Sequence, residues 1–542
     1  MMEHGKLWAV VLILGSAWAV SGQEQGPAPR VVTIPPEQGP APRMLRAKLK
    51  TPEELAQAID RHLEAHWKAN NVTPAPLADD AELNRRLHLD LLGQIPAIGD
   101  VRTFLNDKDP AKRDRQITEL FKRPGFLSHY GTVLRQTWLP QATDNQEFQF
   151  LSPQFETWIR KKLKSDTPTD QIVREMLTAP TLFNGRRNNF NGNPEDTPFA
   201  FNQVNEFKPE NVASMASRLF MGVKIECAQC HNHPFAPYKK EQFWELAAFF
   251  AEVQPTIANV SDVKVKREIK IPETTKVIQA KFFDGKDPTW DAAKSPRQTF
   301  ADWLTAKDNP YFARNFANRL WAYFFGVGLI DPIDEPSDEN PPAIPALLEE
   351  LTQAFIDNGY DQKFLMRAIV RSKAYQLTSR QTHPSQADPR FFARMTIKGL
   401  SGEQLFDSLS QATGYVDNTP REQRPFGGTR RDFVIKFSST EKITEKQKSI
   451  LQALTMMNGR FVIDQTSTKG VFLVGIVDSP LWTPREKLDM LFLATLSRFP
   501  TRPEAERFGS YVEQGGVDVD PDKALADVFW ALLNSSEFSL NH

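Results

Sequence analysis

The sequence has no excess of charge of either sign. Lysine and arginine together number 66, and aspartate and glutamate number 67, so the formal net charge at pH 7 is −1. A balanced chain has no strong long-range field, and such a field is what draws a polyanion to a protein surface. We therefore do not expect nucleic acid as a partner. With 40% hydrophobic and 25% charged residues, the composition is that of packed globular structure.

Long apolar runs are also scarce, with one exception near the N-terminus. Lys6 precedes an apolar stretch over residues 7–20, and small residues follow at Ser21 and Gly22. The stretch is as long as a signal-peptide core but short for a bilayer span, so it predicts a signal peptide at residues 1–22. An uncleaved anchor is the alternative, and the lack of a nearby cysteine excludes a lipoprotein anchor. The mature chain is predicted to be exported, periplasmic or extracellular, without a transmembrane span.

The length of the chain, 542 residues, exceeds what one hydrophobic core fills, since single cores stop growing near about 250 to 300 residues. Residues 23–46 repeat a Pro- and Gly-rich segment and predict a disordered tether. Helical periodicity then dominates, except where apolar and charged residues alternate and predict a short β-hairpin. We expect a mainly α fold of two helical domains, at 47–253 and 295–542, with a β-containing connector at 254–294 between them.

Capping residues and apolar spacing place the individual helices. Thr51-Pro52-Glu53-Glu54 is a capping box with proline at the first helical position, and it opens a helix that runs to Lys68. Another helix begins at Ser295-Pro296. The remaining predicted helices cover residues 81–92, 110–121, 153–163, 209–223, 311–325, 343–356, 363–372, 445–457, 484–496 and 521–533.

The common catalytic signatures are missing. The chain has no Gly-x-Ser-x-Gly elbow, phosphate loop, dinucleotide fingerprint or His-Glu-x-x-His helix. The local signals of hydrolase, kinase and dehydrogenase chemistry are therefore absent. Whether the protein is an enzyme stays open, and no catalytic residue is named.

Cysteine occurs only twice, and both copies belong to one motif, Cys227-Ala-Gln-Cys230-His231. On composition alone, about one shuffled chain in ten thousand would show this arrangement. It is typical of c-type haem attachment, in which the two thiols form thioethers with the haem vinyl groups and His231 ligates the iron. Export agrees with haem c, because bacteria attach it outside the cytoplasm. Candidates for a sixth iron ligand are Met215, Met221, His129, Met456 and Met457.

Two other uses of the motif stay open. Zinc or another transition metal suits thiolate and imidazole ligands, here Cys227, Cys230, His231 and His233. Ligands so close in sequence strain a tetrahedral site, so a distant residue would have to complete it. A disulfide between the cysteines is the second alternative. Haem requires a flat apolar cavity beside His231, whereas a metal site requires several of these side chains to converge.

Weaker patterns surround the motif. An apolar stripe on the helix over residues 243–250 would shield a haem or face an ordinary core. Residues 331–340 hold five carboxylates that calcium could use, although a solvated loop is the preferred interpretation. The basic stretch 417–436 is predicted to be an exposed loop. Polar residues on two helices are expected to bridge helices rather than bind ligands; they are Arg86, Asp90, Arg314, Asn315, Asn318 and Arg319.

Several stretches resemble a known pair of families. Residues 79–96, 227–235 and 243–250 look like the planctomycete cytochrome-like exported proteins, catalogued as domain of unknown function number fifteen-forty-nine. The downstream part resembles the family that usually follows on the same chain, number fifteen-fifty-three. Its matching stretches are 309–314, 318–321, 325–329, 340–342, 374–377, 452–459 and 530–538.

The resemblance implies an exported protein, of a kind often encoded beside sulfatase-like partners. We expect an exported sulfatase-like partner or a redox partner. The family's cytochrome label rests on the same Cys-x-x-Cys-His motif, so it adds no independent support for haem. One position departs from the usual pattern, since Asn232 stands where aspartate is frequent. This difference affects a position that would hold a metal ligand or a residue in contact with the ligands. It leaves the cysteines and His231 unchanged.

These features together predict an exported c-type haem protein that transfers electrons or performs haem-based redox chemistry on an unknown substrate. The alternative is a metal-dependent or metal-stabilised exported enzyme or scaffold. It would act in the breakdown of extracellular polymers, such as sulfated polysaccharides, with residues 227–233 as its metal or disulfide site.

Overall fold

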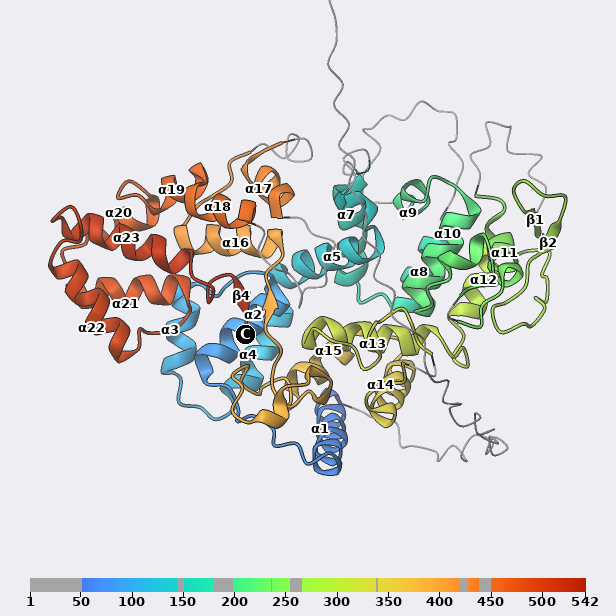
Figure 1. Ribbon diagram of the computed structural model, residues 1–542, viewed down its shortest axis with the longest axis horizontal. Helices are drawn as coiled ribbons and strands as arrows, with labels where there is room; N and C mark the ends of the chain where they lie inside the picture. Colours follow the sequence, from blue (N-terminus) through green and yellow to red (C-terminus); the bar gives the residue numbers. More distant parts are fainter. Residues whose placement is uncertain are drawn as a thin grey trace, which may run out of the picture. The chain divides into compact units, whose positions relative to one another are not determined.

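Helices make up nearly all of the regular structure in a computed structural model of the protein (Figure 1). The structure describes residues 51–144, 148, 151–179, 198–234, 236–253, 266–337, 340–419, 427–437 and 450–542. The predicted signal peptide at 1–22 and tether at 23–46 lie outside these residues. Among the described residues the prediction of a mainly α fold is confirmed.

The elements up to the hairpin follow one another closely in the chain. The helices are α1 (Pro52–Ala69), α2 (Asp80–Leu92), α3 (Ile98–Asn106), α4 (Lys112–Lys122), α5 (Pro124–Trp138), α6 (Gln141–Asp144), α7 (Ser152–Lys164), α8 (Thr169–Leu177), α9 (Ala200–Val204), α10 (Pro209–Ala216) and α11 (Lys240–Ala247). Three shorter turns accompany them: the π-helical η3 (Ser217–Met221) and the 3₁₀ turns η4 (Glu226–Gln229) and η5 (Ala248–Phe250).

The first helix forms as its capping box predicts. The Thr51 backbone N–H donates to Glu54 Oε2 at 3.1 Å, and the Glu54 N–H donates to Thr51 Oγ1 at 3.2 Å. These two bonds satisfy N–H groups that have no partner within the helix. The side chains of Leu55, Ile59 and Leu63 recur along one face and are fully buried, so packing of this face holds α1 on the core.

A short hairpin occupies part of the predicted connector. Strand β1 (Glu268–Lys270) pairs antiparallel with β2 (Val277–Gln279), and Ile269 lies opposite Ile278. The predicted hairpin is therefore present. The alternating residues Val263 and Val265, on which the prediction partly rested, lie outside the described residues.

The rest of the chain is helical apart from a second small sheet. It comprises α12 (Pro296–Leu304), α13 (Phe312–Phe325), α14 (Pro345–Asp357), α15 (Gln362–Arg371), the 3₁₀ turns η6 (Pro384–Gln386) and η7 (Pro389–Phe391), β3 (Lys398–Gly399), α16 (Gly402–Thr413), α17 (Thr429–Phe437), α18 (Ile450–Asn458), α19 (Arg460–Thr466), α20 (Val471–Val477), α21 (Pro484–Thr495), α22 (Arg502–Glu513), α23 (Pro521–Leu533) and β4 (Leu540–Asn541). Strand β4, next to the C-terminus, pairs antiparallel with β3.

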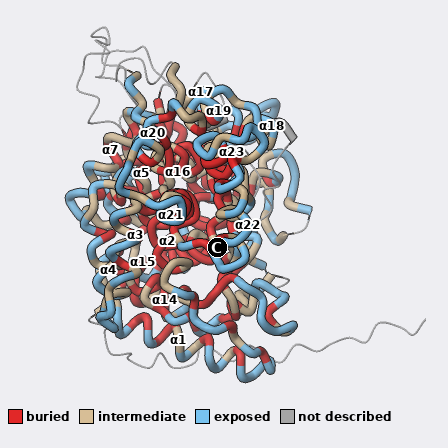
Figure 2. The backbone as a smooth tube through the Cα atoms, turned by 90° about the vertical axis from the view of Figure 1, so that its left-hand side faces the viewer, coloured by how far each residue is buried: buried red, intermediate tan, exposed pale blue. Residues whose placement is uncertain are grey.

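Buried residues run through the interior of the fold (Figure 2), and the apolar ones form two cores. The larger core joins the helices from α1 to α15 except α3, and it includes Ile271 and Ile278 of the hairpin region. The smaller core joins α16–α23 and takes in Leu89 of α2, whose other face, with Leu83 and Leu87, belongs to the larger core. The predicted division between the helical domains lies at residues 254–294. The division between the two cores lies near residue 400 of the chain, and α2 contributes to both cores.

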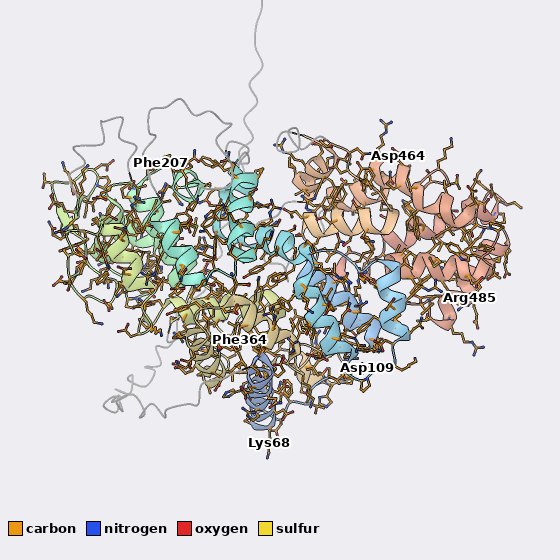
Figure 3. The ribbon with its side chains drawn as sticks, turned by 180° about the vertical axis from the view of Figure 1, so that it is seen from behind. Lys68, Asp109, Phe207, Phe364, Asp464 and Arg485 are labelled. Carbon is orange, nitrogen blue, oxygen red and sulfur yellow. The ribbon has the colours of Figure 1, made fainter. Side chains whose placement is uncertain are left out.

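Side chains fill the space between the helices, as seen from behind in Figure 3. The charged residues Lys68, Asp109 and Arg485 lie at the surface, whereas Phe364 is buried. Residues 48–542 form one compact unit. In the part of the chain that the structure describes, no helix combines the length and the apolarity that a membrane crossing requires.

Candidate functional site

The Cys-x-x-Cys-His motif follows a helix that changes its winding before it ends. The α10 helix continues into the π-helical turn η3, which stops at Gly222 with φ at +69°. The Ser217 hydroxyl donates to the Val223 carbonyl at 2.6 Å, and the Val223 N–H donates back to the Ser217 carbonyl at 3.2 Å. These bonds fix the direction in which the chain leaves the helix. The predicted helix over 209–223 is present, with this altered last turn.

The motif itself is a 3₁₀ turn with one side packed and the other open. Ile225 and Ala228 are fully buried, and the Ala228 N–H donates to the Ile225 carbonyl at 2.9 Å. Cys227, Cys230 and His231 are all exposed. The apolar residues thus hold the turn against the core while both thiols and the imidazole face outward. All three groups are accessible to a cofactor arriving from solution.

The imidazole of His231 makes one hydrogen bond that determines where its proton lies. Its Nδ1 is 2.7 Å from the carbonyl oxygen of Asn232. A carbonyl oxygen only accepts, so Nδ1 carries the hydrogen in this arrangement and a neutral imidazole keeps its lone pair on Nε2. Metal-ligating histidines are commonly held in this way, with one nitrogen donating to the protein and the other free to bind.

The following helix, α11, holds the loop from its N-terminal side. The Lys240 N–H donates to Asn232 Oδ1 at 3.0 Å, and the Trp244 indole N–H donates to the Gln229 carbonyl at 3.0 Å. Asn232 thereby satisfies the first N–H of α11, whose N-cap residue is Lys239. The sequence had suggested a ligand or a residue behind the ligands at this position; the structure gives it a capping bond.

His233, the additional ligand in the metal interpretation, lies half-buried beside Tyr238. Their rings meet edge to face with centroids 5.9 Å apart, and the His233 N–H donates to the Tyr238 carbonyl at 2.8 Å. Nowhere in the described residues do three or more histidine, cysteine, aspartate or glutamate side chains come together as a metal ion would require. The structure therefore does not bring His233 together with the cysteines and His231 as a ligand set.

The apolar stripe of α11 belongs to the core. Phe243, Leu246 and Ala247 are fully buried, as is Phe250 in the adjoining turn η5. Of the two interpretations of this stripe, an ordinary core face is the one observed. Three of the candidate iron ligands are also enclosed: Met221 and Met456 are buried in the larger and smaller cores, and His129 is hydrogen-bonded to Tyr323 at 2.9 Å.

Polar side chains of α13 hold the segment that leads to the motif. Asn315 Nδ2 donates to the Leu219 carbonyl at 2.7 Å, and Arg319 donates to the Arg218 carbonyl at 2.7 Å. Gly222 approaches Asn315 so closely that an added Cβ would lie 2.6 Å from Oδ1, and its positive φ also favours glycine. The expectation that these polar residues bridge helices is confirmed for Asn315 and Arg319.

The acidic loop after α13 completes this contact. Asp334 accepts from Arg218 Nε at 2.7 Å and also pairs with Arg319, while its carbonyl accepts the Lys224 N–H at 3.0 Å. Glu335 lies 3.3 Å from Lys224 Nζ. From sequence, these two carboxylates were interpreted as part of a solvated loop, with calcium binding as the alternative. They pair with cations around the motif; Asp338 and Glu339 lie outside the described residues.

A second polar cluster lies between the two cores, around Asp90 of α2. Its carboxylate accepts from Lys398 Nζ at 2.8 Å, from the Tyr375 hydroxyl at 2.8 Å and from Asn541 Nδ2 at 2.7 Å. Lys398 also donates to the carbonyls of residues 323 and 324 at the end of α13. Burial lowers the pKa of Lys398 and raises that of Tyr375. The sequence had singled out Asp90 but none of its partners.

The arginines next to Asp90 bind the C-terminal end of the chain. Arg86 donates to the carbonyls of Tyr375 and Leu377 at 2.6 and 2.9 Å, and to that of His542 at 3.1 Å. Arg85 donates to the Phe538 carbonyl at 2.8 Å. The bonds to Phe538 and His542 join α2 to residues more than 400 positions away, so the cluster has the geometry of a structural joint.

His129 extends this cluster and predicts how stability depends on pH. Burial lowers the pKa of His129 from its usual 6.5 to about 4. Below about pH 6.5 the unfolded chain takes up this proton while the folded chain does not, so the folded state loses stability as the pH falls toward 4. We expect the free energy of unfolding, measured by urea titration, to fall less between pH 6.5 and 4 in His129→Gln than in the parent. An equal fall in both proteins would contradict this assignment.

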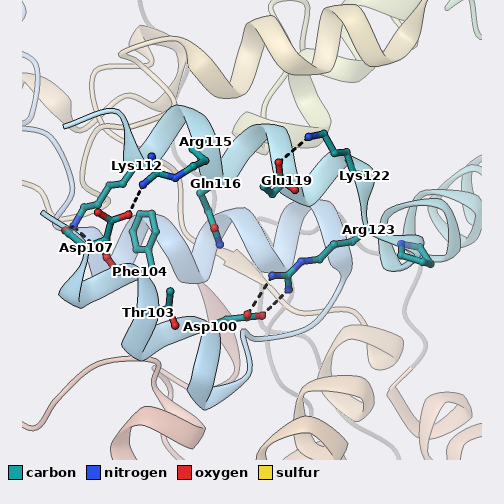
Figure 4. Close-up of a pocket in the computed structure, with 11 residues that line it drawn as sticks. Asp100, Thr103, Phe104, Asp107, Lys112, Arg115, Gln116, Glu119, Lys122 and Arg123 are labelled. Atoms are coloured by element: carbon teal, nitrogen blue, oxygen red, sulfur yellow. Dashed lines mark hydrogen bonds and ion pairs between the residues drawn. The ribbon is translucent and has the colours of Figure 1, made fainter. Parts of the chain in front are cut away.

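A surface pocket of about 480 Å³ lies away from the motif, along α3 and α4 (Figure 4). Six of its seven charged side chains pair with one another: Arg123 with Asp100, Arg115 with Asp107, and Lys122 with Glu119. The seventh, Lys112, pairs with Asp80 outside the lining. Because each charge has a partner, the pocket presents no uncompensated charge to a ligand.

Two stretches of the chain match families of known proteins. No curated protein and no solved structure matches it. Residues 58–255 match a family described as a protein of unknown function (DUF1549), and residues 296–434 match a second, also described as a protein of unknown function (DUF1553). The first match contains the motif and α2, and the second contains α13 and the acidic loop. The chain therefore belongs to the proteins that carry DUF1549 followed by DUF1553.

Proposed function

We propose that the protein is an exported c-type haem protein, in which haem is bound through Cys227 and Cys230 and His231 ligates the iron. The observation that carries the proposal is the arrangement of the motif: both thiols are exposed, and His231 donates from Nδ1 to a carbonyl, which leaves Nε2 to bind. The signal-like N-terminus supports export. The three residues fit the group as donors, since thioether formation needs free thiols and the iron needs an unprotonated ring nitrogen. The apolar side chains of α11 do not supply the cavity wall that haem needs, because they are packed into the core.

A haem bound in this way would supply one-electron redox chemistry. The protein's own contribution would be to hold the proximal ligand in one orientation and to leave the attachment face open to a redox partner or a small substrate. Electron transfer or haem-based redox chemistry are the two activities that this placement supports. The sulfatase-like partner implied by the sequence resemblance is a second proposal, for which co-purification from the native host is the test.

The decisive experiment is production of the full chain in a bacterial host that has the cytochrome c maturation machinery. We expect the exported protein to gain the mass of one haem, to show a Soret band, and to give a pyridine haemochrome spectrum of thioether-linked haem. The mass should also show a new N-terminus near residues 21–23. The double variant Cys227→Ser/Cys230→Ser should lose the covalent mass completely.

Two single variants separate haem from the metal alternative. His231→Gln should change the visible spectrum because it removes the proximal ligand, whereas His233→Gln should leave it as in the parent. If instead the protein contains stoichiometric zinc, no haem, and needs both histidines to retain the metal, the haem proposal is wrong. A mass decrease of two protons with neither group bound would indicate a disulfide.

A further inference from the structure

The loop that follows the motif depends on one side chain more than on any other. Asn232 is exposed, yet it makes two hydrogen bonds through different groups: its carbonyl accepts from His231 Nδ1 at 2.7 Å, and its side-chain Oδ1 accepts from the Lys240 N–H at 3.0 Å. The first bond sets the proton position on the imidazole. The second ties the same residue to the first turn of α11.

The two bonds are coupled through the backbone of a single residue. The side-chain bond to Lys240 helps to hold the backbone of Asn232, whose carbonyl is the oxygen that His231 uses. The exposed segment between Cys230 and His233 is also held by the Trp244 contact to the Gln229 carbonyl before it and by the His233 contact to Tyr238 after it. The His233 N–H lies in the same planar peptide unit as the Asn232 carbonyl, so the Tyr238 contact and the Lys240 bond hold this carbonyl together.

We propose that Asn232 is the positioning residue of the motif: by capping α11 it orients its own carbonyl to hold His231 with Nδ1 protonated and Nε2 free to bind. This inference rests on the proposed function, because a free Nε2 matters only if His231 ligates iron. Its test does not require haem. Aspartate at this position can make the same capping bond and carries a negative charge at the start of a helix, which is favourable there. Alanine cannot make the bond.

The test measures the proton position on His231 in protein that cannot attach haem. The chain with Cys227→Ser/Cys230→Ser, labelled with ¹⁵N in its histidine rings, is examined by solid-state ¹⁵N NMR at about pH 8.5, where imidazole is neutral. The chain has nine histidines, so the His231 signals are assigned by their loss in His231→Gln. We expect the Nδ1-protonated form to predominate.

Three variants in the same background then decide the role of Asn232. Asn232→Ala should shift the ratio of Nδ1–H to Nε2–H about twofold toward Nε2–H. This is less than the roughly fivefold change expected for complete loss of the His231 hydrogen bond, because the His233 N–H still holds the same peptide unit. Asn232→Asp should retain the ratio, and Gln229→Ala, a change in the same loop that spares its backbone bonds, should retain it as well. An unchanged ratio in Asn232→Ala, or an Nε2-protonated ring in the parent, overturns the proposal.

A second readout applies once haem is attached. Asn232→Asp should lower the reduction potential relative to the parent, because a negative charge close to the proximal ligand favours the ferric state. An unchanged potential would place residue 232 too far from the ligand to act on it. If the parent binds no haem, the proposed function fails, while the NMR ratio still determines whether Asn232 orients His231.

Discussion

Asp90→Ala should destabilise the protein by about 3 to 5 kcal/mol, the range for removing one partner of a buried ion pair. Asp90 and Lys398 are both almost fully buried, and their charged atoms lie 2.8 Å apart. The substitution leaves the Lys398 ammonium without a counter-charge. It also leaves the Tyr375 hydroxyl and the Asn541 amide without the acceptor that each now has. Urea unfolding monitored by tryptophan fluorescence gives the change in free energy.

Two controls separate the charge from the packing. Asp489→Ala removes an exposed ion pair with Arg485 in α21 and should cost less than about 1 kcal/mol. In the double variant Asp90→Leu/Lys398→Met, which replaces both charges by apolar side chains, part of the lost stability should return. If Asp90→Ala were no more destabilising than Asp489→Ala, the cluster would not be the joint between the cores.

Several of the helices that the sequence predicted carry local signals at their ends, although α16 and α22, which also begin with capping boxes, were missed. Thr51 and Glu54 form a capping box, and Pro296 and Pro484 stand in the first turns of α12 and α21. Each signal depends on residues within four positions of one another, so one sequence is enough to detect it.

The prediction missed α5 although its apolar residues are regularly spaced. Phe126, Tyr130, Leu134 and Trp138 recur every four positions and are all buried. The two glycines in this helix argue against helix by propensity. One of them, Gly131, lies where an added Cβ would be 2.9 Å from Arg160 of α7, so glycine is required by close packing. Tertiary contact outweighs propensity here.

The candidate site likewise has a part that the local sequence indicates and a part that it does not. The motif could be read from five adjacent residues, whereas the exposure of its thiols and its supports could not. Asp334 lies 116 positions from Arg218, and nothing in either local segment indicates the other. The bonds from Arg85 and Arg86 to the C-terminal residues are more distant still. Local patterns therefore indicated the candidate residues, while only the fold shows what holds them in place.

Asp334→Ala is the second change with a large expected effect, because Asp334 joins residues 218–224, which lead to the motif, to α13. Its carboxylate contacts Arg218 and Arg319 and is itself mostly buried, with 16% of the side chain exposed. Burial lowers the pKa of Arg319, and the contact with Asp334 opposes this effect. Removing the carboxylate leaves the Arg319 guanidinium without its counter-charge and leaves Arg218 with Glu226, 3.8 Å away. We expect a loss of about 2 to 4 kcal/mol in the free energy of unfolding.

The neighbouring residue gives a matched control for this change. Glu335 pairs with Lys224 at the surface, where 52% of the Glu335 side chain is exposed, so Glu335→Ala should cost less than about 1 kcal/mol. Hydrogen exchange should show faster exchange of residues 218–231 in Asp334→Ala and no change there in Glu335→Ala. Because residue 334 lies within the second matched family and the motif within the first, this pattern would mean that the second family domain stabilises the loop that carries the cysteines. Equal exchange in both variants would mean that the segment leading to the motif is held by α10 and η3 alone.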